Sequence, residues 1–151
     1  MTLPYQSATT GKRAMDEIQK HLRQFGCSKF ATGEDYDTGE IFIQFEHRGR
    51  LINMKASANG YAEAWLKENP YNRRRRCTPQ EHTRKAMEIG ATAIYSVLRD
   101  AIKAQLVLVE IGIRKFEAAF LADIMLPDGR TVIEELENQQ LLPAPKDKAN
   151  G

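Results

Sequence analysis

Cysteine is scarce in this sequence: only Cys27 and Cys77 occur among 151 residues. Two thiols fifty positions apart cannot form the disulfide framework of a small secreted domain, so a reducing cytoplasm is the simplest expectation. The first residues lack the charged and apolar segments of a signal peptide. Apolar runs such as residues 106–109 are far shorter than the ~18 residues of a membrane span. The sequence therefore predicts a cytoplasmic protein with no membrane segment.

The chain also lacks a strong overall charge and a glycine-rich phosphate loop. Its net charge is +2 and its pI about 8.5, which argues for no particular partner. With 42% hydrophobic and 28% charged residues, the composition is that of an ordinary globular protein. The length fits one domain. We expect a single α+β domain over residues 1–142 and a disordered tail, rich in proline and lysine, over residues 143–151.

The first half of the sequence predicts a helix followed by a small sheet. Apolar residues recur every three or four positions over residues 12–25, with Thr9 or Thr10 before them and Gly26 after them. Three strand patterns follow, over residues 27–32, 40–46 and 50–56, joined by turn-rich segments. A three-stranded antiparallel meander is the economical arrangement. A short helix over residues 61–67 would then carry Tyr61 and Trp65 on one face.

The clearest helix start in the chain is Thr78-Pro79-Gln80-Glu81. It combines an N-cap threonine, a proline in the first turn and the glutamate of a capping box. About thirty residues follow with helical periodicity, and Gly112 is the expected stop or kink. Residues 106–111 are β-branched enough to form a strand, but the polar stripe continues to Glu110 and favours a helix. The predicted apolar stripe contains Met87, Ala91, Ile94, Leu98, Ala101 and Ile102, and the predicted polar face contains Lys85, Glu88, Thr92, Ser96, Arg99, Lys103 and Glu110.

The remaining patterns predict a second helix over residues 114–124, a tight turn at Leu126-Pro127-Asp128-Gly129 and a short helix from Thr131 to about Gln140. The predicted fold class is therefore α+β: a small three-stranded antiparallel sheet packed against a long helix, with shorter flanking helices.

Four consecutive arginines precede the Thr78 helix start. Guanidinium groups this close repel one another, and their fork geometry matches phosphate oxygens. Residues 60–85 contain seven Lys or Arg against three Glu, a local net charge of about +4. Tyr61, Trp65 and Tyr71 add rings that could stack on exposed bases. A solvated loop beside a core tryptophan would give the same pattern. The candidate nucleic-acid-binding residues are Lys67, Tyr71, Arg73, Arg74, Arg75, Arg76, Arg84 and Lys85.

Other chemistry has weaker support. Cys77 and His82 are two potential zinc ligands where a structural site needs four, and nothing in the sequence brings Cys27, His21 or His47 to them. Glu117 and Asp123 would lie on different faces of one helix, and Asp128 is explained by its turn. Glu40, Glu46 and Lys55 are the best remaining trio for a nuclease. We therefore expect no cofactor, no metal and no enzymatic activity.

The segment Leu126-Pro127-Asp128-Gly129-Arg130-Thr131-Val132, with the pattern from Ile102 to Phe120 before it, resembles a family of small phage and prophage proteins. The strand pattern from Ile43 to Gly49 resembles the same family, and the similarity covers about residues 12–136. The resemblance implies no particular reaction, and it assigns a catalytic role to none of these residues. It implies a phage-derived protein of the host cytoplasm, of the kind that handles DNA or disarms host machinery.

Two functions remain open on the sequence. The first is a non-enzymatic phage accessory protein that binds nucleic acid, DNA rather than RNA, through its arginine-rich segment. The second is a module that binds a host or phage protein, for example as an inhibitor of a host nuclease or defence complex. Because residues 106–113 offer more apolar surface than a small sheet can cover, we also expect a homodimer.

Overall fold

The computed structural model describes residues 2–146 and has the predicted α+β architecture. The helix α1 (Gly11–Phe25) leads into a sheet of β1 (Lys29–Asp35), β2 (Glu40–His47) and β3 (Arg50–Ser57). The strands are antiparallel in the order β1-β2-β3, so the predicted meander is confirmed. β1 begins two residues later than predicted because Gly26, at φ 103°, ends α1 and Cys27 and Ser28 make the turn.

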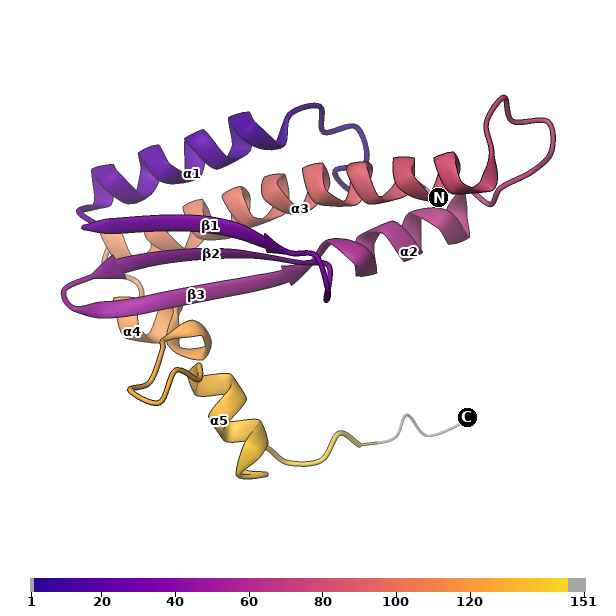
Figure 1. Ribbon diagram of the computed structural model, residues 1–151. Helices are drawn as coiled ribbons and strands as arrows, with labels where there is room; N and C mark the ends of the chain where they lie inside the picture. The colour runs from indigo at the N-terminus through magenta and orange to yellow at the C-terminus, as the bar shows by residue number, and fades with distance from the viewer. Residues whose placement is uncertain (1, 147–151) are drawn as a thin grey trace.

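The two longest helices cover one face of the sheet. The helix α3 (Pro79–Glu110) lies along α1, and both pack over the strands, as Figure 1 shows. Their shared core contains Ile18 and Leu22 of α1, the alternating Ile41, Ile43 and Phe45 of β2, and Ile94, Leu98, Ile102 and Leu106 of α3. Alternate residues of β2 point to the other face, which explains its period-two burial.

A helical hairpin extends beyond the end of the sheet. The helix α2 (Ala58–Glu68) continues from β3 and packs against the first half of α3. A second, smaller core of Ala62, Trp65 and Ala86 holds the two helices together, and Leu3 packs against it. The lead-in that contains Leu3 is anchored, since the Tyr61 hydroxyl donates to the Pro4 carbonyl (2.5 Å) and the Tyr5 hydroxyl to Asp100 (2.7 Å).

The C-terminal part corrects one prediction. Residues 114–124 are not one helix: a single turn, α4 (Phe116–Ala119), is followed by the 3₁₀ turn η1 (Leu121–Asp123). The break places the Phe120 ring edge-on to Phe45, 5.4 Å between centroids, inside the core. The chain then runs beside β3, where Met125 N–H donates to Leu51. The predicted capping box at Thr131 opens α5 (Val132–Asn138).

Three positions of α3 depart from the predicted stripes. Ser96 was expected on the polar face but is buried, whereas Met87 and Ala101 were expected in the apolar stripe and are exposed. The predicted tail lies partly outside the described residues: 143–146 form no helix or strand, and 147–151 are not described.

Candidate nucleic-acid interface

The arginine-rich segment forms the connection between α2 and α3, residues 69–78, here called the arginine loop. It projects from the end of the helical hairpin, away from the sheet (Figure 1). Its exit is fixed as the sequence predicts. The Thr78 hydroxyl accepts from Glu81 N–H (3.2 Å), and the Glu81 carboxylate accepts from Thr78 N–H (2.8 Å). Both partners of the capping box are therefore present at the first turn of α3.

His82 anchors the base of the loop. Its ring is 2% exposed and lies between Trp65 and Tyr71, with centroid separations of 5.2 and 5.9 Å. Its Nε2 is 2.7 Å from the carbonyl oxygen of Asn69, the residue at which α2 ends. The loop therefore starts from a packed, hydrogen-bonded base. The His82 ring is therefore engaged in packing and in the contact with the Asn69 carbonyl.

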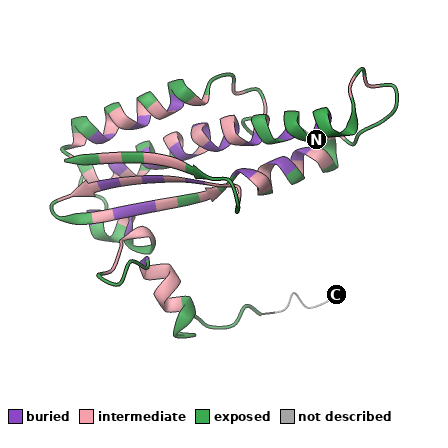
Figure 2. Cartoon of the chain, in the orientation of Figure 1, coloured by how far each residue is buried: buried purple, intermediate pink, exposed green. Residues whose placement is uncertain are grey.

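The four arginines lie on the outer part of the loop. Arg73, Arg74 and Arg76 are exposed and Arg75 is half-buried, in agreement with the exposed surface of the loop in Figure 2. None of the four forms an ion pair within the part of the chain that the structure describes. The backbone N–H of Arg74 donates to Asn72 Oδ1 and that of Arg75 to Asn72 O, which gives the loop a defined turn. No carboxylate of residues 2–146 therefore compensates the guanidinium charges of this segment.

Three further cations flank the loop from the two helices. Lys67 lies in the last turn of α2, and Arg84 and Lys85 lie in the second turn of α3. All three are exposed, and none has an ion-pair partner among residues 2–146. The sequence-predicted basic residues are thus gathered at one end of the hairpin. Because seven positive side chains share this end, it is the most concentrated basic surface that the sequence predicted.

The prediction that Trp65 stacks on exposed bases is wrong. Trp65 is 4% exposed and belongs to the hairpin core, since the α2–α3 contact needs its large apolar surface. Tyr61 is half-buried and bound to Pro4. Tyr71 is 37% exposed, but its hydroxyl donates to the Cys77 carbonyl (3.1 Å). The interface therefore offers charge, with at most one partly available ring.

The alternative catalytic residues do not converge. Glu117 pairs with Arg50 (3.6 Å), and Asp128 accepts from Arg130 N–H in its turn. Burial raises the pKa of the Asp123 carboxyl. The sheet trio is also divided, because Lys55 pairs with Glu134 (2.9 Å) and Glu46 with Lys29 (3.1 Å). Among residues 2–146, no three His, Cys, Asp or Glu side chains are grouped so as to hold a metal ion.

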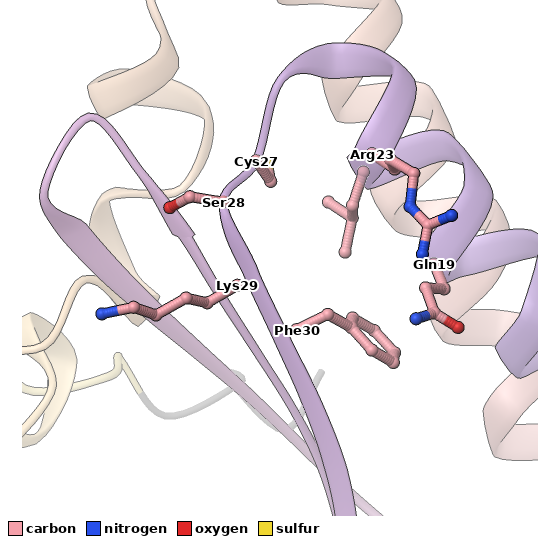
Figure 3. A pocket seen from close by; sticks show the side chains of 7 residues that line it. Gln19, Arg23, Cys27, Ser28, Lys29 and Phe30 are labelled. Atoms are coloured by element: carbon pink, nitrogen blue, oxygen red, sulfur yellow. The ribbon is translucent and has the colours of Figure 1, made fainter.

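A hollow between the end of α1 and the start of β1 is separate from the arginine loop. It has a volume of about 190 Å³ and is lined by Leu22 and by the residues that Figure 3 labels. Burial raises the pKa of the Cys27 thiol there to about 11, so this cysteine is a poor nucleophile at neutral pH. The hollow contains none of the predicted nucleic-acid-binding residues.

Sequence reasoning missed a second basic cluster. A hollow of about 530 Å³, here called the aromatic hollow, lies between the β2–β3 turn and the α3–α4 turn. Arg48, Arg114 and Lys115 are on its border, and none forms an ion pair with a described residue. The sequence signal was weak, because single cations in two turns sixty-six positions apart attract no notice.

No protein-family model, no curated protein and no solved structure matches this chain. Within residues 2–146, no helix has both the length and the apolarity to cross a membrane.

Proposed function

We propose that this protein binds nucleic acid by phosphate contacts from the arginine loop and catalyses no reaction on it. The observation that carries the proposal is the placement of Arg73, Arg74 and Arg76, which are exposed on a projecting loop with no acidic partner among the described residues. Exposed arginines without partners contribute little to folding. Clustered arginines against the positive end of a helix dipole disfavour the fold slightly, which supports a role in binding.

The chemistry of the loop favours contacts with the nucleic-acid backbone over base readout. Guanidinium forks bind phosphate oxygens in pairs, and such contacts carry no sequence information. With Trp65 in the core, base stacking has little to contribute. The proposal is therefore a binder with low sequence preference and strong salt dependence, acting on DNA rather than RNA. The resemblance of the C-terminal segment to phage proteins supports a phage accessory role in the host cytoplasm.

A second function is supported by an adjoining surface, which shares Arg84 with the basic end of the hairpin. A hollow of about 300 Å³ lies between the β1–β2 turn and α3, with Tyr36, Ile41 and Met87 in its lining. Tyr36 is 90% exposed and Met87 is also exposed, and the charged residues Glu34, Asp35, Glu40, Arg84 and Glu88 surround them. Exposed apolar side chains rimmed by charge are typical of protein-binding sites. This surface favours the alternative of an interaction module, for instance an inhibitor of a host nuclease or defence complex.

Fluorescence anisotropy separates the two functions. The wild-type protein is titrated into labelled single-stranded DNA, duplex DNA and duplex RNA of equal length. The test variant replaces Arg73, Arg74, Arg75 and Arg76 by alanine. The control replaces four other exposed cations by alanine: Lys12, Lys20, Arg23 and Lys103. Net charge falls equally in both, so a loss of binding confined to the first variant supports the proposal. Absence of binding by the wild-type protein to all three probes refutes it.

A further inference from the structure

The aromatic hollow combines three features that no structural role explains together. Its lining includes Phe25, His47 and Phe116, and the His47 ring lies 4.9 Å from the Phe25 ring and 4.7 Å from the Phe116 ring. Phe25 and His47 are half-buried, so part of each residue is exposed to solvent. The His47 Nδ1 atom is buried and has no hydrogen-bond partner among the described residues, which is uncommon for a buried polar group.

Cations border this ring surface from two separate turns. Arg48 lies in the β2–β3 turn with φ 49°, an unfavourable backbone for a residue with a side chain. Arg114 and Lys115 follow Gly112 at the end of α3. All three side chains are exposed, and the one carboxylate of the lining, Glu117, is paired with Arg50. The hollow therefore has excess positive charge beside aromatic rings.

Stabilisation of the helix end accounts for only part of this arrangement. Cations after the C-terminus of a 32-residue helix interact favourably with its dipole, which explains Arg114 and Lys115. It does not explain Arg48, which comes from the opposite turn. The helix end also needs no cation to satisfy its last carbonyls, because those of Val107, Leu108 and Val109 accept hydrogen bonds from backbone N–H groups of residues 111–114. The charge is available for a ligand.

We propose that the aromatic hollow binds one nucleotide unit, with its phosphate at Arg48, Arg114 and Lys115 and its base against the rings of Phe25 and His47. Aromatic surfaces accept any base by stacking, and arginine accepts phosphate in pairs. The volume of about 530 Å³ is within the range of small-ligand sites. A free mononucleotide and the end of a strand both present this unit, with the same chemistry.

The position of the hollow in the fold gives binding of a strand end a specific consequence for the length of the nucleic acid. The hollow and the arginine loop lie at opposite ends of α3, as Figure 1 shows for the turns that form them. The 32 residues of α3 span about 48 Å, which is the length of about 14 base pairs. A duplex that reaches both sites must exceed that length. This extension rests on the proposed function of the arginine loop, whereas mononucleotide binding does not.

The first test uses deoxyadenosine monophosphate in an NMR titration of the ¹⁵N-labelled protein. The probe should shift the amides of residues 47–49 and 112–116, and the double variant Arg114→Gln with Lys115→Gln should bind it at least tenfold more weakly. Lys20→Gln with Lys103→Gln is the charge-matched control and should bind as the wild type does. Deoxyribose 5-phosphate and deoxyadenosine are the two half-probes, and each should bind more weakly than the whole nucleotide.

Three results would overturn the inference: no shifts in these turns, an equal loss in the control variant, or equal binding of deoxyribose 5-phosphate and the nucleotide. The variant that lacks the four arginines of the loop should keep mononucleotide binding. Failure of the arginine-loop proposal can therefore be distinguished from failure of the aromatic-hollow proposal. With DNA duplexes of 8 and 24 base pairs, the Arg114 and Lys115 substitutions should weaken binding of the longer one by a larger factor. An equal factor for both lengths would refute the strand-end extension.

Discussion

At the residue scale, the environment of each polar side chain decides whether it is available for chemistry. Trp65 and His82 are buried in the base of the hairpin, while the arginines next to them in sequence are exposed. Residues of one short segment thus have opposite roles, packing or exposure to solvent, within a few positions. Two predictions test this division directly, one on the half-buried thiol of Cys27 and one on the buried imidazole of His82.

Cys27 should react slowly with alkylating reagents. Burial raises the pKa of its thiol from 9.0 to about 11, which lowers its thiolate fraction at neutral pH by about 100-fold. In a Cys77→Ser variant, iodoacetamide at pH 7.5 should therefore modify the folded protein about 100-fold more slowly than the urea-unfolded protein, as followed by mass spectrometry. Equal rates in the two states would show that the thiol is not protected.

His82→Leu should destabilise the protein by about 1–3 kcal/mol, because the Asn69 carbonyl loses its 2.7 Å partner at a buried position. Urea unfolding measures the loss, and amide exchange should accelerate in residues 69–78. His21→Leu is the control, since that half-buried ring has no hydrogen bond in the described chain. Unchanged stability of the His82 variant would mean that the histidine does not anchor the loop.

At the element scale, α3 packs against a different neighbour in each half. Its first half contacts α2 through Ala86 and Gly90, and its second half contacts α1 and the sheet through Leu98 and Ile102. A Cβ built on Gly90 would lie 2.6 Å from the carbonyl oxygen of Ala58. The glycine therefore permits α2 to approach α3 closely.

Gly90→Ala should consequently destabilise the protein, although alanine is the better helix former by about 1 kcal/mol. The clash with backbone atoms of α2 should outweigh that gain and leave a net loss of about 1–3 kcal/mol in urea unfolding. Glu88→Ala, an exposed change two positions away, should stay within about 0.5 kcal/mol. A stabilised Gly90 variant would contradict the close packing of the two helices.

This packing also explains what could be predicted from the sequence. Local signals were sufficient for the capping boxes at Thr78 and Thr131, the glycine stop at Gly26 and the alternation of β2, because each depends on near neighbours in the chain. A single apolar stripe could not describe α3, because the helix has neighbours on several sides. Ser96, which lies outside the predicted apolar stripe, is therefore buried as well.

The candidate sites divide in the same way. The arginine loop was recognisable because its charges are contiguous in sequence. The burial of Trp65 depends on the contact between α2 and α3, which no local pattern reveals. The aromatic hollow joins residues 25, 47–48 and 109–117, so only the folded chain brings them together.

At the scale of the whole molecule, apolar surface remains at the C-terminal end of α3, where Val107, Ile111 and Ile113 are exposed. We expect a second copy to cover it. Light scattering at micromolar concentration should give twice the 17.1 kDa of the chain. Val107→Asp with Ile111→Asp should halve that mass, while Leu141→Asp, at another exposed apolar position, should not. A wild-type mass of 17 kDa would contradict the dimer.

The central claim is that the arginine loop contacts phosphates, and the salt dependence of duplex-DNA binding tests it most directly. Each phosphate contact contributes about 0.9 to the slope of log affinity against log salt concentration. Replacing Arg73, Arg74, Arg75 and Arg76 by alanine should reduce that slope by about 3–4 and weaken binding at low salt, with thermal melting almost unchanged. A folded quadruple variant that keeps the wild-type affinity and slope would contradict the claim, and a variant that fails to fold would show that the arginines are structural.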